Sequence, residues 1–387
     1  MYISHLDVHN WRNFQEISID LRKRVFIVGP NASGKSNFLD IIRFLRDITK
    51  IGGGLQEAVR SRGGVSKIRC LSARAHSDIE IGITLSDDRS DEVLWKYSLC
   101  FTQVGGGVFK TRAKLKQEVV KRADGTILLE RPDNKDKNDE KLLEYTYLEQ
   151  PNANYNYREV AEFLQGIQYL HVIPQLLRDP NSFLKISSGE DFYGRDLIER
   201  INNTNTNTRR ANLRKIQNAL VKAVPQFREL SLEKDEMGIP HLQAVYQHWR
   251  AKGAKQWEDQ FSDGTLRLIG FLWSLLDGTK PLLLEEPELS LHSGVVSSLP
   301  DVIYKLQKKK YGIRQVILST HSYDLLSNIG IAGEEVVVLN PEFEGTDVKL
   351  ATDEKQITDL LKSGMKIADI VIPKTTPPKI NQLSLQF

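Results

Sequence analysis

Residues 29–36 constrain this chain more than any other part of its sequence. They read GPNASGKS and fit the pattern G-x-x-x-x-G-K-[ST]. The apolar run 25–28 precedes them, and a run with helical spacing, 37–45, follows them. A strand, a loop and a helix in this order form the context in which the pattern builds a phosphate-binding loop. We therefore expect an α/β fold of the P-loop NTPase type, with ATP and Mg²⁺ as cofactors.

Each part of this loop has an expected task. Glycines let backbone N–H groups turn toward a phosphate, and the N-terminus of the following helix favours negative charge. The ammonium group of Lys35 would reach the β- and γ-phosphates and assist catalysis, and the hydroxyl of Ser36 would meet Mg²⁺. The predicted nucleotide-binding residues of the loop are Gly29, Pro30, Asn31, Ala32, Ser33, Gly34, Lys35, Ser36 and Asn37.

Composition narrows the class of protein. The chain has 387 residues, a net charge of +3 and two cysteines, Cys70 and Cys100, which are too few for a disulfide framework. The N-terminal residues do not show the basic and apolar regions of a secretory leader. No uncharged apolar run approaches the roughly 20 residues of a membrane span. We expect a cytoplasmic protein with no membrane partner.

The hydrophobic pattern predicts an antiparallel subdomain and a parallel sheet. Two strands joined by a turn at residues 10–13 lead into the phosphate loop, and residues 78–150 alternate as in an antiparallel meander. From residue 261 onward, helices alternate with buried strands at 281–284, 315–319 and 336–339, which is typical of a parallel sheet.

The middle of the chain reads as mostly helical. We expect a helix over 157–166, a buried strand over 167–173, and a helix–loop–helix over 195–224. The Asn/Thr run 202–208 is interpreted as a flexible loop, and 131–141 as a solvated loop. The predicted domains are an N-terminal ATPase lobe (1–77), an antiparallel β subdomain (78–150), a helical insert with connecting strands (151–255) and a C-terminal ATPase lobe (256–387).

Paired carboxylates follow the strand expected at 281–284. An apolar strand that ends in Glu285 and Glu286 is what a Mg²⁺-nucleotide site needs opposite its phosphate loop. We assign Glu285 to the metal and Glu286 to catalysis, as the general base that polarises the attacking water. The alternative is a solvated acidic turn.

Two further elements complete the predicted site. His321 follows an apolar strand, at the carboxyl edge where open α/β sheets place ligand groups, and could bind a γ-phosphate. Residues 261–265 read FSDGT and open a helical run. Ser262 would cap that helix, and Gly264 would let a ligand approach its backbone closely.

Taken in this order, the four elements resemble the ABC-type ATPase heads of the RecF/SMC/OLD group. The resemblance implies that 29–36 is Walker A, Glu285 and Glu286 are Walker B, 261–265 is the signature motif, 288–292 is the D-loop and His321 is the switch histidine. It also implies a homodimer in which each ATP lies between the Walker A loop of one copy and Ser262 and Gly264 of the other.

Some features depart from the family pattern. The signature reads FSDGT where LSGGQ is commonest, and Glu285 replaces the usual Walker B aspartate. Gln56 is one candidate for the Q-loop glutamine. The sequence shows no zinc hook, no long coiled-coil arm and no TOPRIM-like nuclease block.

Without a second catalytic block, the output of the ATPase is expected in a separate effector, a nuclease or toxin, by analogy with bacterial anti-phage modules. The alternative is a RecF-like ATPase that binds DNA in repair or recombination. A transporter ATPase and an inactive nucleotide-gated scaffold are disfavoured. Arg12 and Asn13, in the first turn, could touch the nucleotide or only pack. The basic residues considered as DNA contacts are Arg60, Arg62, Lys67, Arg69, Arg74, Lys308, Lys309 and Lys310.

Overall fold

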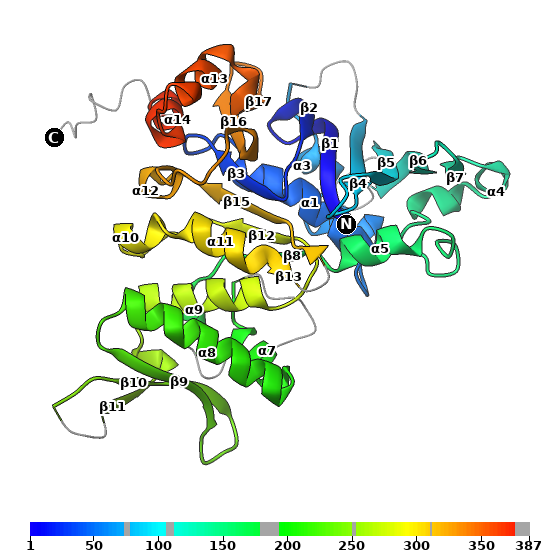
Figure 1. Cartoon of the computed structure of the whole chain (residues 1–387). Helices are drawn as coiled ribbons and strands as arrows, with labels where there is room; N and C mark the ends of the chain where they lie inside the picture. The colour runs from blue at the N-terminus through cyan, green and yellow to red at the C-terminus, as the bar shows by residue number, and fades with distance from the viewer. Residues whose placement is uncertain (73–77, 106–111, 179–192, 250–252, 310–311, 376–387) are drawn as a thin grey trace, which may run out of the picture. The chain divides into compact units, whose positions relative to one another are not determined.

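The computed structural model describes residues 1–72, 78–105, 112–178, 193–249, 253–309 and 312–375 (Figure 1). The chain forms two compact units. The first unit comprises residues 1–168, 279–283 and 308–387, and the second comprises 169–278 and 284–307. Among the described residues, no helix combines the length and apolar character needed to cross a bilayer.

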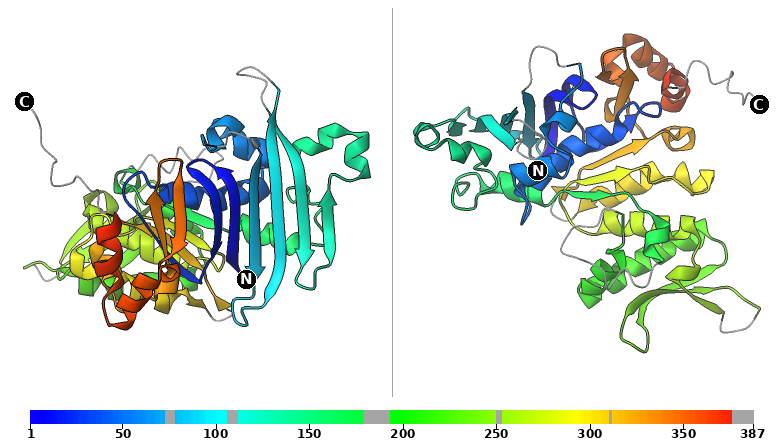
Figure 2. Two further views of the ribbon diagram at one scale, coloured as in Figure 1. Left: turned by 90° about the horizontal axis from the view of Figure 1, so that it is seen from above. Right: turned by 180° about the vertical axis from the view of Figure 1, so that it is seen from behind.

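An antiparallel sheet with the strand order β2-β1-β4-β5-β6-β7 forms one layer of the first unit (Figure 2). Its strands are β1 (Tyr2–Trp11), β2 (Phe14–Asp20), β4 (Ile79–Ser86), β5 (Val93–Val104), β6 (Arg112–Arg122) and β7 (Ile127–Arg131). Burial alternates along β4, with Ile79, Ile81 and Ile83 inside, as expected for a sheet with one covered face. The meander predicted over 78–150 is confirmed as far as Arg131, and its first strand, β4, also pairs with β1 of the N-terminal hairpin.

A mostly parallel sheet forms another layer, in the order β17-β16-β3-β15-β12-β8. Its strands are β3 (Arg24–Val28), β8 (Gln168–Leu170), β12 (Leu282–Glu285), β15 (Val316–Thr320), β16 (Val336–Pro341) and β17 (Thr346–Leu350). Both β15 and β16 run parallel to β3. All five residues of β3 are buried, as is usual for a central parallel strand. The first residues of β8 and β12 belong to the first unit.

Helix α1 (Lys35–Thr49) lies between these sheets and contacts β15. Its aromatic side chains contact the antiparallel sheet: Phe44 lies 5.1 Å from Trp11 and 5.5 Å from Phe101 between ring centroids. Burial of these rings fixes the helix that follows the phosphate loop. The other helices and short strands of the first unit are α2 (Leu55–Arg60), α3 (Val65–Ile68), α4 (Asn134–Asn138), α5 (Arg158–Gln165), β13 (Lys308–Lys309), β14 (Gly312–Ile313), α12 (Tyr323–Leu326), α13 (Lys355–Lys362) and α14 (Ile367–Thr375).

The second unit combines helices with a small antiparallel sheet of order β11-β10-β9. The strands are β9 (Phe227–Lys234), β10 (Pro240–Tyr246) and β11 (Ala254–Trp257). The helices are α6 (Pro174–Leu177), α7 (Leu197–Asn203), α8 (Thr206–Ala223), α9 (Asp263–Leu276), α10 (Ser293–Val296) and α11 (Leu299–Gln307). Helix α8 packs on both β9 and α9.

The prediction of a solvated loop over 131–141 is confirmed for most of its side chains, which are exposed, but it is wrong for Arg131 and Asp136 and for the short helix α4. The side chains of Arg131 and Asp136 are fully buried and form an ion pair of 2.6 Å, and Arg131 also pairs with buried Glu118 at 3.1 Å. The backbone N–H groups of Tyr147 and Leu148 donate to the same Glu118 carboxylate. The charges of Arg131, Asp136 and Glu118 therefore neutralise one another inside the fold, while Lys135, Lys137 and Lys141 stay exposed.

The flexible loop predicted over 202–208 is also wrong. Helix α7 continues to Asn203 and α8 begins at Thr206, so Thr204 and Asn205 alone separate them. The side chain of Asn205 accepts a hydrogen bond from the backbone of Asn207 and caps α8. Asn and Thr favour helix ends as well as loops, and here they serve the ends. The strand expected over 167–173 is confirmed only for Gln168–Leu170, while α5 confirms the preceding helix.

Candidate nucleotide site

The phosphate loop connects β3 to α1, both in the first unit. Val28, the last residue of β3, is the register partner of Thr320 in β15 and of Val338 in β16. Parallel strands expose their carboxyl ends at one edge of a sheet, which is where ligands of open α/β folds bind. His321 is exposed and directly follows Thr320, so it lies at the same edge of the sheet as the phosphate loop.

The backbone of the loop requires its small residues. Ala32 and Gly34 have positive φ angles of 65° and 99°. A Cβ atom on Gly34 would lie 2.2 Å from Nδ2 of Asn13, so no larger residue fits without displacing that side chain. The predicted strand–loop–helix context is thus present, with the glycine where the chain is tightest.

The donors of the loop fit a phosphate group. Gly34 has no side chain to cap α1, and the first turn of that 15-residue helix holds no acidic residue. The ammonium of Lys35 donates to the carbonyl oxygens of Gly29 (2.9 Å) and Pro30 (3.1 Å) while the residue is 8% exposed. The buried hydroxyl of Ser33 has no hydrogen-bond partner among the described residues. A cation, an uncapped helix N-terminus and an orphaned hydroxyl suit an anionic ligand.

The first hairpin supports this loop. Nδ2 of Asn13 donates to the carbonyl oxygen of Ser33 at 2.9 Å and to the Thr346 hydroxyl at 2.8 Å. Its Oδ1 accepts from Nδ2 of Asn37 at 2.7 Å. Asn13 therefore ties the loop, the start of α1 and β17 together through one side chain.

Arg12 belongs to a cluster of charged side chains around Asp40. Its guanidinium pairs at 2.8 Å with Asp40, which also pairs with Arg43 and Arg62. Burial acts to raise the pKa of Asp40, but the three guanidinium groups, Arg62 foremost, outweigh it and hold the pKa below its ordinary value. Arg62 reaches Asp47 as well, at 2.9 Å.

These contacts change the interpretation of the basic residues near α2. The side chain of Arg62 is 3% exposed and committed to Asp40 and Asp47, so it is unavailable to DNA. Arg60, by contrast, is 81% exposed and pairs with Glu57. Lys67 and Arg69 are exposed. Arg74 and Lys310 lie outside the described residues.

Gln56 has a structural role in the first unit. Its Nε2 donates to the carbonyl oxygens of Ala113 (2.8 Å) and Glu144 (2.7 Å), and its Oε1 accepts from the backbone of Ala113. These bonds join α2 to β6 and to the segment after it. They give no support to Gln56 as the Q-loop glutamine.

The predicted acidic pair lies at the end of β12 in the second unit. The hydroxyl of Tyr169 donates to the carboxylate of Glu285, and Nδ1 of His171 lies 3.3 Å from the Glu285 carbonyl oxygen. Glu286 adopts a positive φ of 42°, which is uncommon for a residue with a Cβ. The chain therefore turns sharply where the strand ends. Backbone kept in such a sparsely populated conformation is often found at functional sites.

The predicted signature motif opens α9. The Ser262 hydroxyl accepts from the Thr265 backbone at 3.2 Å, which confirms it as the N-cap. A Cβ on Gly264 would lie 2.6 Å from the carbonyl oxygen of Ser290, so the close approach is made by the predicted D-loop. Arg178, which lies outside the motif in sequence, donates a hydrogen bond to the Phe261 carbonyl oxygen (2.6 Å) and forms an ion pair with the Asp263 carboxylate (2.5 Å).

A buried pair just before the signature was not predicted. Nδ1 of His241 lies 2.6 Å from Oε1 of Glu258, and Oε2 of Glu258 accepts from the backbone of Leu242 at 2.8 Å. The His241 ring stacks on Trp257 with centroids 4.2 Å apart. Burial raises the pKa of Glu258. Because the partners are 17 residues apart in sequence, no local spacing could have revealed them.

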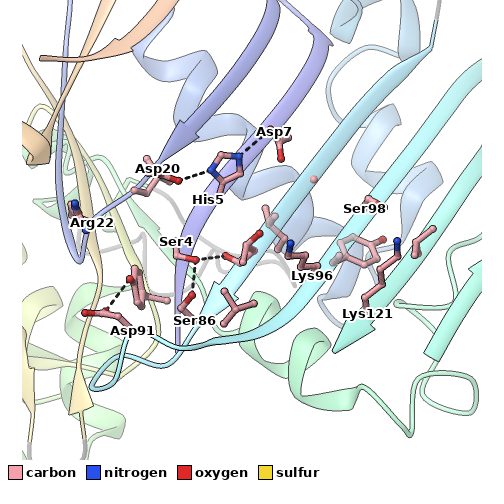
Figure 3. A pocket seen from close by; sticks show the side chains of 18 residues that line it. Ser4, His5, Asp7, Asp20, Arg22, Ser86, Asp91, Lys96, Ser98 and Lys121 are labelled. Atoms are coloured by element: carbon pink, nitrogen blue, oxygen red, sulfur yellow. Dashed lines mark hydrogen bonds and ion pairs between the residues drawn. The ribbon is translucent and has the colours of Figure 1, made fainter. Parts of the chain in front are cut away.

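The face of the antiparallel sheet turned away from α1 carries a separate polar hollow of about 690 Å³ (Figure 3). His5 lies between Asp20 and Asp7, at 2.6 and 3.1 Å. Gly82 leaves space in the middle of the sheet, and Lys96 stands directly opposite Lys121 on neighbouring strands. This hollow contains none of the predicted nucleotide residues.

The fold and the motifs define a P-loop ATPase domain, and comparison with known proteins identifies its family. Residues 24–327 match the family described as "AAA domain, putative AbiEii toxin, Type IV TA system". This span is most of the chain, which therefore belongs to that family. The resemblance to RecF- and SMC-type ATPase heads is confirmed.

Curated relatives are distant. The chain is 23% identical to endonuclease GajA of Bacillus cereus, over 98% of this chain and 67% of that protein. It is 37% identical to the chromosome partition protein Smc of Bacillus subtilis, over 23% of this chain and 7% of that protein. It is 28% identical to RecF of Crocosphaera subtropica, over 22% and 23%. The chain thus spans about two thirds of GajA and less than a quarter of the other two.

Solved structures share the fold. An Smc head, solved bound to the C-winged helix domain of ScpA, superposes with a TM-score of 0.53 at 16% identity, covering 90% of this chain and 98% of that one. A second Smc head, from Pyrococcus furiosus, gives 0.50 at 16% identity, covering 93% and 99%. The predicted α/β ATPase-head fold is confirmed.

Proposed function

We propose that this chain binds and hydrolyses ATP with Mg²⁺, pairs head to tail with a second copy when ATP is bound, and thereby controls a separate nuclease or toxin in anti-phage defence. The observation that carries the ATPase part is the register of β3 and β15. Val28 opposite Thr320 brings the phosphate loop and His321 to one sheet edge, a relationship between segments nearly 300 residues apart. The family match and the similarity to GajA support the defence part.

In this proposal Lys35 and the N-terminus of α1 bind the phosphates, and His321 contacts the γ-phosphate. Ser36 and Glu285 hold Mg²⁺, which would neutralise charge that develops on the phosphate oxygens. Glu286 removes a proton from the attacking water. Ser262 and Gly264 cover the nucleotide of the partner copy. Asn13 supports the phosphate loop and Arg12 pairs with Asp40 of α1. The four sequence-derived domain boundaries remain part of the proposal.

Glu286→Gln tests the catalytic assignment. The amide keeps the shape of the side chain but cannot accept the proton, so ATP turnover should fall on the order of 10²–10⁴-fold. Dimerisation on ATP, measured by light scattering after size exclusion, should persist or strengthen. Glu229→Gln, at an exposed position of β9, is the matched control and should leave turnover unchanged. Retained turnover in Glu286→Gln would remove Glu286 from its role.

A phage assay tests the separate effector. Cells would carry this chain with and without the genes that flank its own, and plating efficiency would be measured. Protection that requires both Lys35 and a flanking nuclease or toxin gene supports the proposal. Protection by this chain alone contradicts a separate effector.

The second candidate function is a RecF-like DNA-binding ATPase. The exposed Arg60, Lys67 and Arg69 favour it, together with the partial match to RecF. A duplex would be bound with an affinity that falls steeply as salt rises, because phosphate contacts release counterions. The triple variant with glutamate at these positions should then lose DNA affinity and reduce the salt slope. No salt-dependent binding by the wild-type chain would exclude this candidate.

A further inference from the structure

Helix α8 carries a strongly basic exposed face in the second unit. Its 18 residues include Arg209, Arg210, Arg214, Lys215 and Lys222 and not one Asp or Glu. The helix buries Asn212, Leu213, Ile216 and Leu220, so Arg210, Arg214, Lys215 and Lys222 point to the exposed side. In the part of the chain that the structure describes, these four side chains form no ion pair.

An apolar groove of about 450 Å³ adjoins this face. Ala219 and Lys222 of α8 form one wall, and Val295 and Val302 belong to the opposite wall, around α10 and α11. Leu268 and Leu272 of α9 contribute to the floor. Figure 1 shows α9 between α8 and α11, all within the second unit. Polar side chains stand at the rim, where Lys222 and Ser298 are exposed.

We propose that this groove binds an acidic amphipathic helix of a partner protein. Leucine-type side chains spaced three and four residues apart would fill the groove, as in other helix-in-groove complexes. Carboxylates flanking that stripe would meet Lys222, which lines the groove, and Lys215, which lies one turn before Ala219 on α8, and this fixes the orientation. Arg210 and Arg214, farther around the same helix, add longer-range attraction that raises the association rate. The surface uses no residue assigned above to ATP, so it stands independently of the proposed function.

The same features disfavour other occupants. A nucleic acid would use the cations but would leave the apolar floor exposed to water. A second copy docked symmetrically would bring together two helices that carry basic and no acidic residues, and like charges repel. An uncharged apolar ligand would leave the four cations without a role.

A peptide-binding measurement on the full chain tests the proposal. The probe is a fluorescent 18-residue peptide whose leucines are spaced alternately three and four residues apart, with glutamate at the other positions. The reference is a scrambled peptide of identical composition. Fluorescence anisotropy should show the striped peptide binding at least about tenfold more tightly, roughly 1.4 kcal/mol. Lys215→Glu with Lys222→Glu should weaken binding tenfold or more, and Ala219→Trp should block the groove.

Controls keep the outcome interpretable. Lys255→Glu, on exposed β11 of the same unit, should leave the affinity unchanged, and circular dichroism should show that each variant is folded. Equal binding of the striped and scrambled peptides would show that charge attraction alone accounts for binding, and it would overturn the proposal. So would a DNA duplex that competes with the striped peptide and binds more tightly than it, or wild-type affinity in folded Ala219→Trp.

Discussion

The side-chain amide of Asn13 donates a hydrogen bond of 2.9 Å to the carbonyl oxygen of Ser33 in the phosphate loop. The same side chain accepts from Asn37 and donates to Thr346. It lies so close to Gly34 that a Cβ there would collide with it. Asn13 therefore sets the position of the loop, and Gly34 leaves the space for it.

Asn13→Ala should weaken ATP binding without touching the proposed catalytic groups. It removes three hydrogen bonds, each with a net value of about 0.5–1.5 kcal/mol, and loosens the loop on the side away from the phosphates. We expect the KM for ATP to rise about tenfold with a smaller change in kcat. Gln15→Ala, two residues further on in β2, where the side chain donates to the exposed carbonyl of Glu344, is the control. An unchanged KM in Asn13→Ala would show that the loop holds its shape alone.

Arg62→Ala should destabilise the fold rather than weaken DNA binding. The substitution leaves the buried carboxylates of Asp40 and Asp47 without their main cation, which typically costs about 3–5 kcal/mol. Chemical denaturation measures the loss. Arg60→Ala, at an exposed pair with Glu57, should cost less than about 1 kcal/mol. Similar small losses in both variants would contradict the structural role of Arg62.

The sequence predicts the nucleotide-binding motifs of this molecule better than its networks of buried charges. Walker A, the acidic strand end and the capping Ser262 are encoded by residues close together in sequence, so spacing alone identifies them. The Arg131–Glu118 pair joins residues 13 apart on two strands, and the Arg62–Asp40 pair joins residues 22 apart. Sequence periodicity cannot tell such a buried pair from a solvated one, because the partner is chosen by the fold.

His5 should make stability depend on pH. Burial acts to lower its pKa, but hydrogen bonds to Asp20 and Asp7 outweigh burial, so its pKa is raised above 6.5. A raised histidine pKa adds stability that is fully present below the unfolded value of 6.5 and disappears as pH rises through the folded value. Thermal unfolding of wild type should therefore lose stability, relative to His5→Gln, as the pH rises above 6.5 and through the raised pKa of His5.

Gln15→Ala, on the neighbouring strand β2, removes no titratable group and should keep the wild-type pH profile. A direct readout is the NMR titration of the His5 ring, whose midpoint should lie above that of a histidine in the unfolded chain. A midpoint below 6.5 would mean that burial dominates over the two aspartates and would contradict the expected profile.

Tyr169→Phe should change how the proposed site responds to Mg²⁺. The Tyr169 hydroxyl donates to the Glu285 carboxylate, so it fixes the orientation of the group assigned to the metal. Partners of metal-binding carboxylates commonly change affinity about 10–100-fold when removed. We expect the Mg²⁺ concentration for half-maximal ATPase activity to rise by at least tenfold while the KM for ATP at saturating Mg²⁺ stays within about twofold. Tyr155→Phe, at a 68% exposed tyrosine, is the matched control. An unchanged Mg²⁺ dependence, with Glu285→Gln inactive, would show that Glu285 is held in place by its backbone turn and not by Tyr169.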